Sequence, residues 1–423
     1  METTLSAPFL AALALASAVV GVLVFRAMPR LTFVVWTIVL FFVPVWIGVQ
    51  LGFFWAALTL VTILAIGANL HRIRWVAADT LVLVFVAISC GVFGLGRASL
   101  SAIVILLLEW IVPYIWGRLV LGCLQMGFIA SALGVAATVA AVLALIEFGT
   151  GSNPFVLLPA LGPSYETWGV LQYRGGVLRA EGAFGHSIAL GASLALATAF
   201  VLASRWRTFV KVVALGIITA AVVVTFSRIA LVCLVITVGL SLVFQRSMSR
   251  GARVGVIVTA ALAATVAVPI LSEVFLNAGS EAAGSAVYRA DLFALVGQLN
   301  WFGASIDWDQ LAGDVYLATY AGSVDNAFLV VALRFGIVPA LLLVALMLMA
   351  VVSLLVPGRA NTATIAVVAQ IPALFSVALI TQYGMFLWFV GGLAVALWAQ
   401  KGEAPPTVGA SSRARSLDLA HHD

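Results

Sequence analysis

The stretch Gly322-Ser323-Val324-Asp325-Asn326-Ala327-Phe328-Leu329 ends the longest polar interruption of the chain and leads directly into a long apolar run. The interruption covers roughly residues 274–324 and is rich in acidic side chains. A charged group held where a polar loop re-enters apolar sequence is costly in a membrane unless it is paired or serves a site. Asp325 is therefore predicted to be a catalytic or substrate-binding carboxylate.

The composition excludes an ordinary soluble domain. Of the 423 residues, 64% are hydrophobic and only 9% are charged, whereas about a quarter of the residues in soluble domains are charged. The net charge of +5 comes from basic residues scattered along the chain, so it predicts no nucleic-acid partner. We predict an all-α polytopic membrane protein with a single transmembrane domain over residues 1–400 and a disordered cytoplasmic tail over residues 401–423.

Apolar runs of about 17–25 residues, long enough to cross a bilayer, define the predicted helices. They give about 12–13 transmembrane helices, near residues 7–25, 31–49, 51–70, 76–96, 98–117, 122–146, 185–203, 209–226, 228–245, 254–273, 325–355, 362–381 and 384–400. The boundaries that the sequence marks least clearly are the tight break at Gln50 and the one at Gln382-Tyr383.

The lysines and arginines predict how these helices are oriented. If the spans alternate in direction, 15 of the 21 basic residues fall on one side of the membrane. The exceptions are Arg97, Arg174, Arg179, Arg228 and Arg289 on the other side, and Arg334 within a span. Because cytoplasmic loops carry the excess of positive charge, the N-terminus is predicted to lie outside and the C-terminus inside.

Two long loops fall on the predicted outer side, at residues 146–184 and 274–324, and they hold most of the outer acidic residues. Both contain aromatic side chains, which favours ordered segments at the membrane surface over disordered linkers. Residues 288–296 carry apolar side chains at helical spacing, so an interfacial helix is predicted there.

The outer arginines have two interpretations. They form solvated pairs with the outer acids, or they bind an anionic substrate, because the guanidinium group matches phosphate oxygens. The first interpretation is favoured for Arg174. The second is favoured for Arg228, because the break Thr225-Phe226-Ser227-Arg228-Ile229 is so short that the arginine lies at the mouth of the helix bundle. Ser227 is the predicted N-cap of the helix that follows.

His186 and Asp325 each have a structural alternative to a chemical role. His186 is either a base or ligand at the outer end of a span, or a neutral interfacial histidine. Asp325 is either a general base or an N-cap, a duty that Ser323 or Asn326 could share. No cluster of His, Asp and Glu has metal-ligand spacing, so neither a metal nor a cofactor is predicted.

Two charges lie inside predicted spans. Glu109 lies in the fifth span, and Arg334 lies nine residues beyond Asp325, about two and a half helical turns. That spacing predicts that Arg334 points away from Asp325. Each charge needs a partner or a water-filled cavity, and both a transport pathway and a contact with lipid phosphate would supply one.

Three segments resemble motifs of the bacterial O-antigen ligase and O-antigen polymerase superfamily of membrane glycosyltransferases. The first is Arg179-Ala180-Glu181-Gly182-Ala183-Phe184-Gly185-His186, followed by Leu190-Gly191. The second is Thr225-Phe226-Ser227-Arg228 with Ala230-Leu231. The third combines Tyr288-Arg289, Gly303, Asp325-Asn326-Ala327-Phe328-Leu329 and Phe335-Gly336-Ile337. The resemblance covers roughly residues 175–345 and depends on the order, spacing and shared outer face of these segments.

The resemblance implies a C-type glycosyltransferase-like fold in the bacterial plasma (inner) membrane, with the active face outward. It implies metal-independent, inverting transfer of glycan from an undecaprenyl-diphosphate-linked donor to a glycan or lipid-linked acceptor, with other glycan-export proteins as potential partners. By resemblance, Arg179 and Arg228 hold the diphosphate with Arg289 as a weaker third, and Asp325 activates the acceptor hydroxyl.

One departure from the family pattern bears on the type of enzyme. Ligases of the family carry a histidine before the Asn of the last motif, where this chain has Asp325. That difference favours a polymerase of O-antigen or exopolysaccharide type over a ligase. Two other classes stay open on the sequence: a solute transporter or a flippase for a cell-envelope precursor, which would use Glu109 and Arg334, and a non-catalytic scaffold for glycan synthesis.

Overall fold

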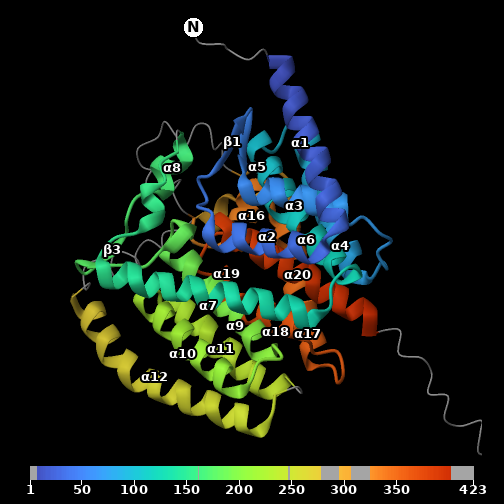
Figure 1. Ribbon diagram of the computed structural model, residues 1–423. Helices are drawn as coiled ribbons and strands as arrows, with labels where there is room; N and C mark the ends of the chain where they lie inside the picture. Colours follow the sequence, from blue (N-terminus) through green and yellow to red (C-terminus); the bar gives the residue numbers. More distant parts are fainter. Residues whose placement is uncertain (1–6, 161, 246–247, 278–294, 306–323, 402–423) are drawn as a thin grey trace, which may run out of the picture.

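The computed structural model describes residues 7–160, 162–245, 248–277, 295–305 and 324–401, and this part of the chain is mostly helical (Figure 1). Arg289, residues 288–294 of the helix predicted over 288–296, and the tail beyond residue 401 lie outside the described residues. The main helices are α1 (Ala7–Ala27), α2 (Pro29–Phe42), α3 (Ala57–Ala68), α4 (Ala77–Gly94), α5 (Leu100–Ile105), α6 (Val112–Leu119), α7 (Met126–Thr150), α8 (Pro163–Trp168), α9 (Ser187–Ala203), α10 (Thr208–Val224), α11 (Arg228–Phe244), α12 (Arg250–Asn277), α16 (Ala327–Phe335), α17 (Ile337–Leu355), α18 (Thr362–Ala369), α19 (Ile371–Leu374) and α20 (Thr381–Lys401).

The remaining described elements are short. A π-helix, η1 (Leu106–Ile111), joins α5 to α6, and four 3₁₀ turns are η2 (Val120–Gly122), η3 (Pro154–Leu157), η4 (Gly182–Phe184) and η5 (Leu295–Gln298). Two antiparallel two-stranded ribbons pair β1 (Gly48–Leu51) with β2 (Phe53–Ala56), and β3 (Tyr173–Arg174) with β4 (Val177–Leu178). So little strand confirms the predicted all-α class.

The number of long helices differs from the sequence prediction. Within the described residues, six helices are long and apolar enough to cross a membrane, or seven if α1 and α2, bent by 118° at their junction, count as one span. This supports a multi-pass membrane protein, but it does not give the 12–13 spans predicted. Helices such as α9, with 17 residues, reach only about 25 Å at 1.5 Å per residue, less than the roughly 30 Å of a bilayer core.

Four predicted spans include backbone that is not helical. The segment 31–49 ends as a helix at Phe42, 51–70 begins in the β1–β2 hairpin, 325–355 breaks at Gly336 between α16 and α17, and 362–381 ends as a helix at Leu374. Hydropathy averaged over a window cannot detect such interruptions, because the residues that make them are themselves apolar.

Helices α7, α9, α10, α11 and α12 lie side by side and form one half of the molecule (Figure 1). Helix α9 is its centre, with fifteen of its seventeen residues buried. Small side chains allow neighbouring backbones to approach closely. At Gly191, for example, an added Cβ would lie 2.7 Å from the Cβ of Ala230 in α11.

The other half of the molecule is built around α20, which packs against α6. The indole of Trp388 in α20 stacks on that of Trp110 in η1, with ring centroids 5.8 Å apart. A buried ion pair joins α4 to α6, because Asp79 accepts from Nε of Arg118 at 2.8 Å and from the hydroxyl of Tyr114 at 2.8 Å. A buried charge requires such partners.

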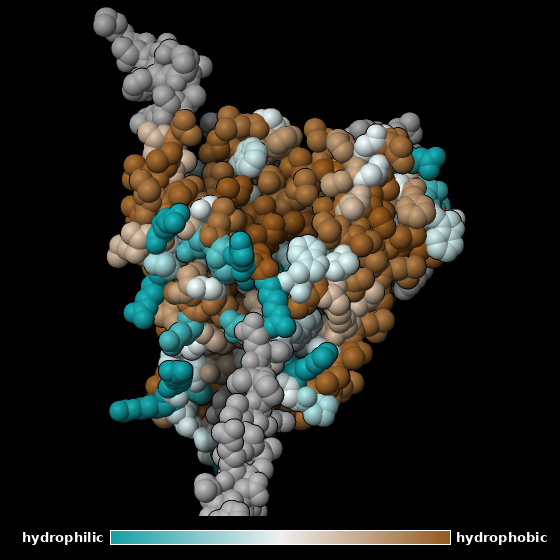
Figure 2. Space-filling view, turned by 90° about the vertical axis from the view of Figure 1, so that its right-hand side faces the viewer, coloured by the Kyte–Doolittle hydropathy of each residue, from teal (hydrophilic) through white to brown (hydrophobic). Residues whose placement is uncertain are grey.

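Figure 2 views the molecule from the side on which α20 ends. Hydrophilic residues gather in the central and lower part of this face, and hydrophobic residues surround them above and to the right. Arg72, Arg205 and Arg359, which belong to the predicted cytoplasmic set, have exposed side chains.

The first long loop is ordered over its described residues, as predicted. It consists of η3, α8, the β3–β4 ribbon and η4, and it lies at the end of the bundle where α7 finishes and α9 begins (Figure 1). The carboxylate of Glu147 accepts from the backbone N–H of Glu181 at 3.0 Å and of Gly182 at 2.8 Å. Trp46 also ties the loop down, donating from Nε1 to the carbonyl of Leu158 at 2.9 Å.

Candidate functional site

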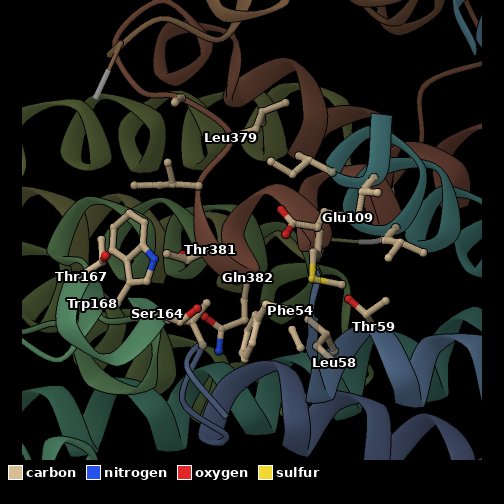
Figure 3. A pocket seen from close by; sticks show the side chains of 18 of the residues that line it. Phe54, Leu58, Thr59, Glu109, Ser164, Thr167, Trp168, Leu379, Thr381 and Gln382 are labelled. Atoms are coloured by element: carbon tan, nitrogen blue, oxygen red, sulfur yellow. The ribbon is translucent and has the colours of Figure 1, made fainter. Parts of the chain in front are cut away.

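A cavity of about 930 Å³ lies where the first long loop, the β1–β2 hairpin, η1, α16 and the start of α20 meet. Among the side chains that line it are four ionisable ones, Glu109, His186, Asp325 and Arg334. Figure 3 shows Glu109 from η1 facing the same space as Trp168 from α8 and Thr381 from α20. Segments far apart in sequence therefore build one polar chamber inside an apolar protein.

Asp325 lies just before α16 and is not the cap of that helix. The N-cap is Asn326, whose side-chain oxygen accepts from the backbone N–H of Leu329 at 3.0 Å. Asn326 therefore has the structural role of helix cap that had been one of the two interpretations of Asp325. The carboxylate of Asp325 is half-buried in the cavity wall, where it can meet a bound molecule.

His186 is both the N-cap of α9 and part of the cavity lining. Its Nδ1 accepts from the backbone N–H of Ile188 at 3.2 Å, so in the neutral ring the hydrogen lies on Nε2. Burial, with a smaller contribution from the nearby positive charge of Arg179, lowers the pKa of His186 to about 4. The histidine is therefore neutral near pH 7 and offers the cavity a hydrogen-bond donor, not a base at Nδ1.

Arg334 faces the cavity together with Asp325, contrary to the prediction that the two point apart. The prediction counted helical turns from Asp325, but α16 begins at Ala327 and the backbone before it is extended. Within the helix, Val330 and Arg334 are one turn apart and both line the cavity.

Glu109 is the electrostatic partner of Arg334. It comes from η1, a single π-helical stretch inside an otherwise α-helical segment, and such stretches are frequent at functional sites. Arg334 lies in the last turn of α16, where the helix dipole favours a positive charge. The cavity wall thus carries a carboxyl group and a guanidinium group that interact electrostatically.

Arg174 and Arg179 converge on the turn between α10 and α11. Arg179 donates from Nε to the carbonyl of Thr225 at 3.0 Å, and Arg174 donates from Nη1 to the carbonyl of Phe226 at 3.0 Å. Phe226 is buried and has a positive φ of 48°, a conformation that costs free energy in a residue with a side chain. The two arginines help to hold this strained turn.

Arg228 follows that turn as the first residue of α11 and is exposed. The predicted N-cap is confirmed, because the hydroxyl oxygen of Ser227 accepts from the N–H of Ala230 at 3.3 Å. Arg174, Arg179 and Arg228 therefore lie around one turn, between α10 and α11. None of the three belongs to the cavity lining, although Arg179 is close enough to His186 to affect its pKa.

Glu181 supports the loop that carries Arg179 and His186. It is fully buried, and its Oε1 accepts from the N–H of Gln172 at 2.6 Å. Burial, assisted by the negative charge of Glu147, raises the pKa of Glu181 to about 8. Glu181 therefore holds a proton at neutral pH and makes this loop sensitive to alkaline pH.

The cavity also contains polar residues that sequence reasoning did not select, notably Ser164, Thr381 and Gln382. Gln382 was assigned to a break between two spans, whereas it lies in the first turn of α20. The signal in the sequence was the polar pair Thr381-Gln382 next to an apolar helix. The same pair would also be expected in a short loop between two spans, so it did not identify a site.

Comparisons with protein-family models, with curated proteins and with solved structures find no match to this chain, so the family resemblance of its motifs stays a hypothesis.

Proposed function

We propose that this protein transfers glycan from an undecaprenyl-diphosphate-linked oligosaccharide to a glycan acceptor at the outer face of a bacterial plasma membrane, as a polymerase of O-antigen or exopolysaccharide type. The observation that carries the proposal is that Asp325 and His186 line the same cavity of a membrane protein. A carboxylate that does not cap the helix suits the acceptance of a proton from a hydroxyl group, and a neutral histidine whose Nε2 carries the hydrogen can donate a hydrogen bond to a sugar or phosphate oxygen.

In the proposed reaction, Asp325 acts as the general base. The acceptor hydroxyl attacks the anomeric carbon of the donor sugar, and its proton passes to the carboxylate of Asp325. The bond between the anomeric carbon and the diphosphate oxygen breaks, and the lipid diphosphate leaves with the electron pair. Attack from the face opposite the leaving group inverts the anomeric configuration.

The leaving diphosphate needs positive charge, and the chain offers it at the α10–α11 turn. Arg174, Arg179 and Arg228 lie together there, next to the loop that ends in His186. Fixed cations placed where negative charge develops stabilise a transition state without a metal ion. In this arrangement the diphosphate occupies the arginine side of His186 and the acceptor occupies the cavity.

A second candidate is a transporter or flippase for a cell-envelope precursor. The observation that favours it is the break at Gly336 beside the Glu109–Arg334 pair, because discontinuous helices with charged groups near their ends are typical of transport sites. Glu109→Gln with Arg334→Gln would abolish transport, whereas a transferase would keep much of its activity because neither residue touches the reacting atoms.

The decisive variant is Asp325→Asn, with Asn326→Ser as its matched control. Loss of a general base lowers the rate by about 10²–10⁴-fold, whereas serine still caps α16. Polymer length and the remaining lipid-linked oligosaccharide should be measured in membranes that contain equal amounts of each protein. Full-length polymer from Asp325→Asn would remove Asp325 from the mechanism.

A further inference from the structure

The start of α20 contributes a polar group to the cavity that no part of the proposed reaction uses. Gln382 is only 3% exposed. Its Nε2 donates to the carbonyl of Val43 at 2.7 Å and, more weakly, to that of Ala183 at 3.4 Å. These two acceptors fix which end of the amide is nitrogen. Oε1 therefore points the other way, and it is buried without a hydrogen-bond partner among the described residues.

Thr381 repeats the pattern one residue earlier. Its Oγ1 is also buried without a partner in the described part of the chain, and its backbone has a positive φ of 51°. For a β-branched residue this conformation is strained, and such strain clusters at functional sites. Thr381 is also the first residue of a long helix, whose first N–H groups have no partner within the helix. Figure 3 shows both side chains beside the same open space.

The mixture of donors and acceptors selects the class of ligand. The amide oxygen of Gln382 only accepts, the hydroxyl of Thr381 does both, and the backbone N–H groups at the start of α20 only donate. A phosphate or diphosphate offers acceptors alone, so it would face Gln382 Oε1 with repulsion. Neighbouring hydroxyl groups of a sugar each donate and accept, and they satisfy all three kinds of group at once.

We infer that Thr381 and Gln382 form a sugar-binding subsite in the cavity, and that it holds the acceptor glycan. The indole of Trp168 lines the same space (Figure 3) and lies where it can contact a bound sugar. Asp325 lines the same cavity, so a sugar held at α20 can present another hydroxyl to that carboxylate. The assignment to the acceptor rests on the proposed function, whereas sugar binding itself does not require catalysis.

The test measures binding to the full-length protein in lipid nanodiscs. Methyl glycosides of common hexoses, N-acetylhexosamines and hexuronic acids are titrated one at a time, with pyrophosphate as the anionic alternative. A ligand that binds the folded state raises the unfolding temperature, and the stabilisation grows with the logarithm of one plus the ratio of the free ligand concentration to Kd. At least one glycoside is expected to do so, whereas pyrophosphate should give a shift that the α20 variants leave unchanged.

The variants Gln382→Leu and Thr381→Val should each weaken glycoside binding by roughly tenfold, the effect of losing one buried hydrogen bond. Thr381→Ser keeps the hydroxyl and should bind like the native protein. Gln370→Leu is the matched control, because Gln370 is an equally buried glutamine, paired with the hydroxyl of Tyr383, that does not line the cavity. Thr381→Val decides the question alone if Gln382→Leu does not fold.

Three results would overturn the inference: no shift with any glycoside, equal weakening in Gln370→Leu, or a pyrophosphate shift that depends on Thr381 and Gln382. Asp325→Asn separates this inference from the proposed function. It should lose transfer but still bind the glycoside in a way that depends on Thr381 and Gln382, because an amide oxygen can also accept from a sugar hydroxyl. If that variant retains transfer, the proposed catalytic base is wrong, yet the binding data still decide the subsite.

Discussion

His186 begins α9 and lines the cavity with the same imidazole ring, and each role constrains the other. Because Nδ1 accepts from the N–H of Ile188, protonation of that nitrogen would break the cap. The buried ring therefore resists protonation, which agrees with its lowered pKa of about 4. The same ring keeps its Nε2 hydrogen directed away from the helix start, where a ligand oxygen can accept it.

Acid should destabilise the native protein through His186. In the unfolded chain the imidazole binds a proton below its ordinary pKa of 6.5, whereas in the folded protein it does so only near pH 4. The free energy of unfolding therefore falls as the pH is lowered from 6.5 towards 4. His186→Asn keeps a capping side chain and removes this titration. Unfolding temperatures of the native protein and the variant should be measured across that pH range. On acidification, the unfolding temperature of the native protein should fall relative to that of the variant.

Glu181 should make the free energy of unfolding change with pH in the opposite direction, so it checks the interpretation of His186 within the same protein. Its pKa rises from 4.5 to about 8 on folding, so the folded state binds the extra proton and the contribution of Glu181 to stability is lost as the pH rises through this window. As the pH rises, the free energy of unfolding of the native protein should fall relative to that of Glu181→Gln. Parallel pH profiles for the native protein and either variant would contradict the corresponding assignment.

At the scale of elements, the break between α16 and α17 positions the charged side of the cavity. Gly336 has a φ of 103°, and an added Cβ would lie 2.6 Å from the carbonyl oxygen of Trp301. Around it, the N–H of Ile337 donates to the carbonyl of Asn300, and the N–H of Gly303 donates to the carbonyl of Phe335, both at 2.9 Å. The broken helix is thus held by backbone bonds, and Arg334 ends its first half.

Gly336→Ala should therefore destabilise the protein, by about 1–3 kcal/mol for the forced backbone conformation, with additional cost from the contact with Trp301. Activity should fall as well, because a shift of α16 would also move Asp325, which lies two residues before the start of that helix. Gly239→Ala in α11 is the control: nothing lies within 4 Å of the added Cβ, and alanine is favoured over glycine in a helix by roughly 0.5–1 kcal/mol. If Gly336→Ala and Gly239→Ala changed the unfolding temperature equally, the proposed role of Gly336 in the break would be contradicted.

At the scale of the whole molecule, the described helices place the end of α7 and the end of α17 toward opposite ends of the bundle (Figure 1). The distribution of lysine and arginine predicts that the first end lies outside and the second in the cytoplasm. The candidate cavity and the arginine turn both belong with the first end, through the loop that connects α7 to α9.

Cysteine labelling tests that assignment directly. Ser152, just after α7, and Arg359, just after α17, are both exposed. In intact cells, a membrane-impermeant maleimide should label Ser152→Cys and leave Arg359→Cys unlabelled until the membrane is permeabilised. The native protein, with Cys90, Cys123 and Cys233, gives the background. Labelling of Arg359→Cys in intact cells would reverse the orientation and move the proposed site to the cytoplasm.

The sequence predicted the position of most helices to within a few residues, because a long apolar run in a chain with so few charges has few alternatives to a membrane helix. It also predicted the ordered first loop and the cap at Ser227. It did not predict which runs are broken, since Gly336 and the β1–β2 hairpin are as apolar as the helices they interrupt.

What the sequence by itself determined is the class of protein, an all-α membrane protein with its polar residues concentrated in a few loops, because hydropathy is a property of each residue. Tertiary structure alone decided which of those residues meet. Asp325 and Arg334 come from one segment, and His186 and Glu109 from two others, whereas helix counting had set Asp325 and Arg334 apart. The arginines gather at a turn beside the cavity, and the start of α20 supplies polar groups to its wall. Which of these residues lie close together depends on where helices end, where they break and which residues cap them. The periodicity of side chains along the sequence does not encode these features.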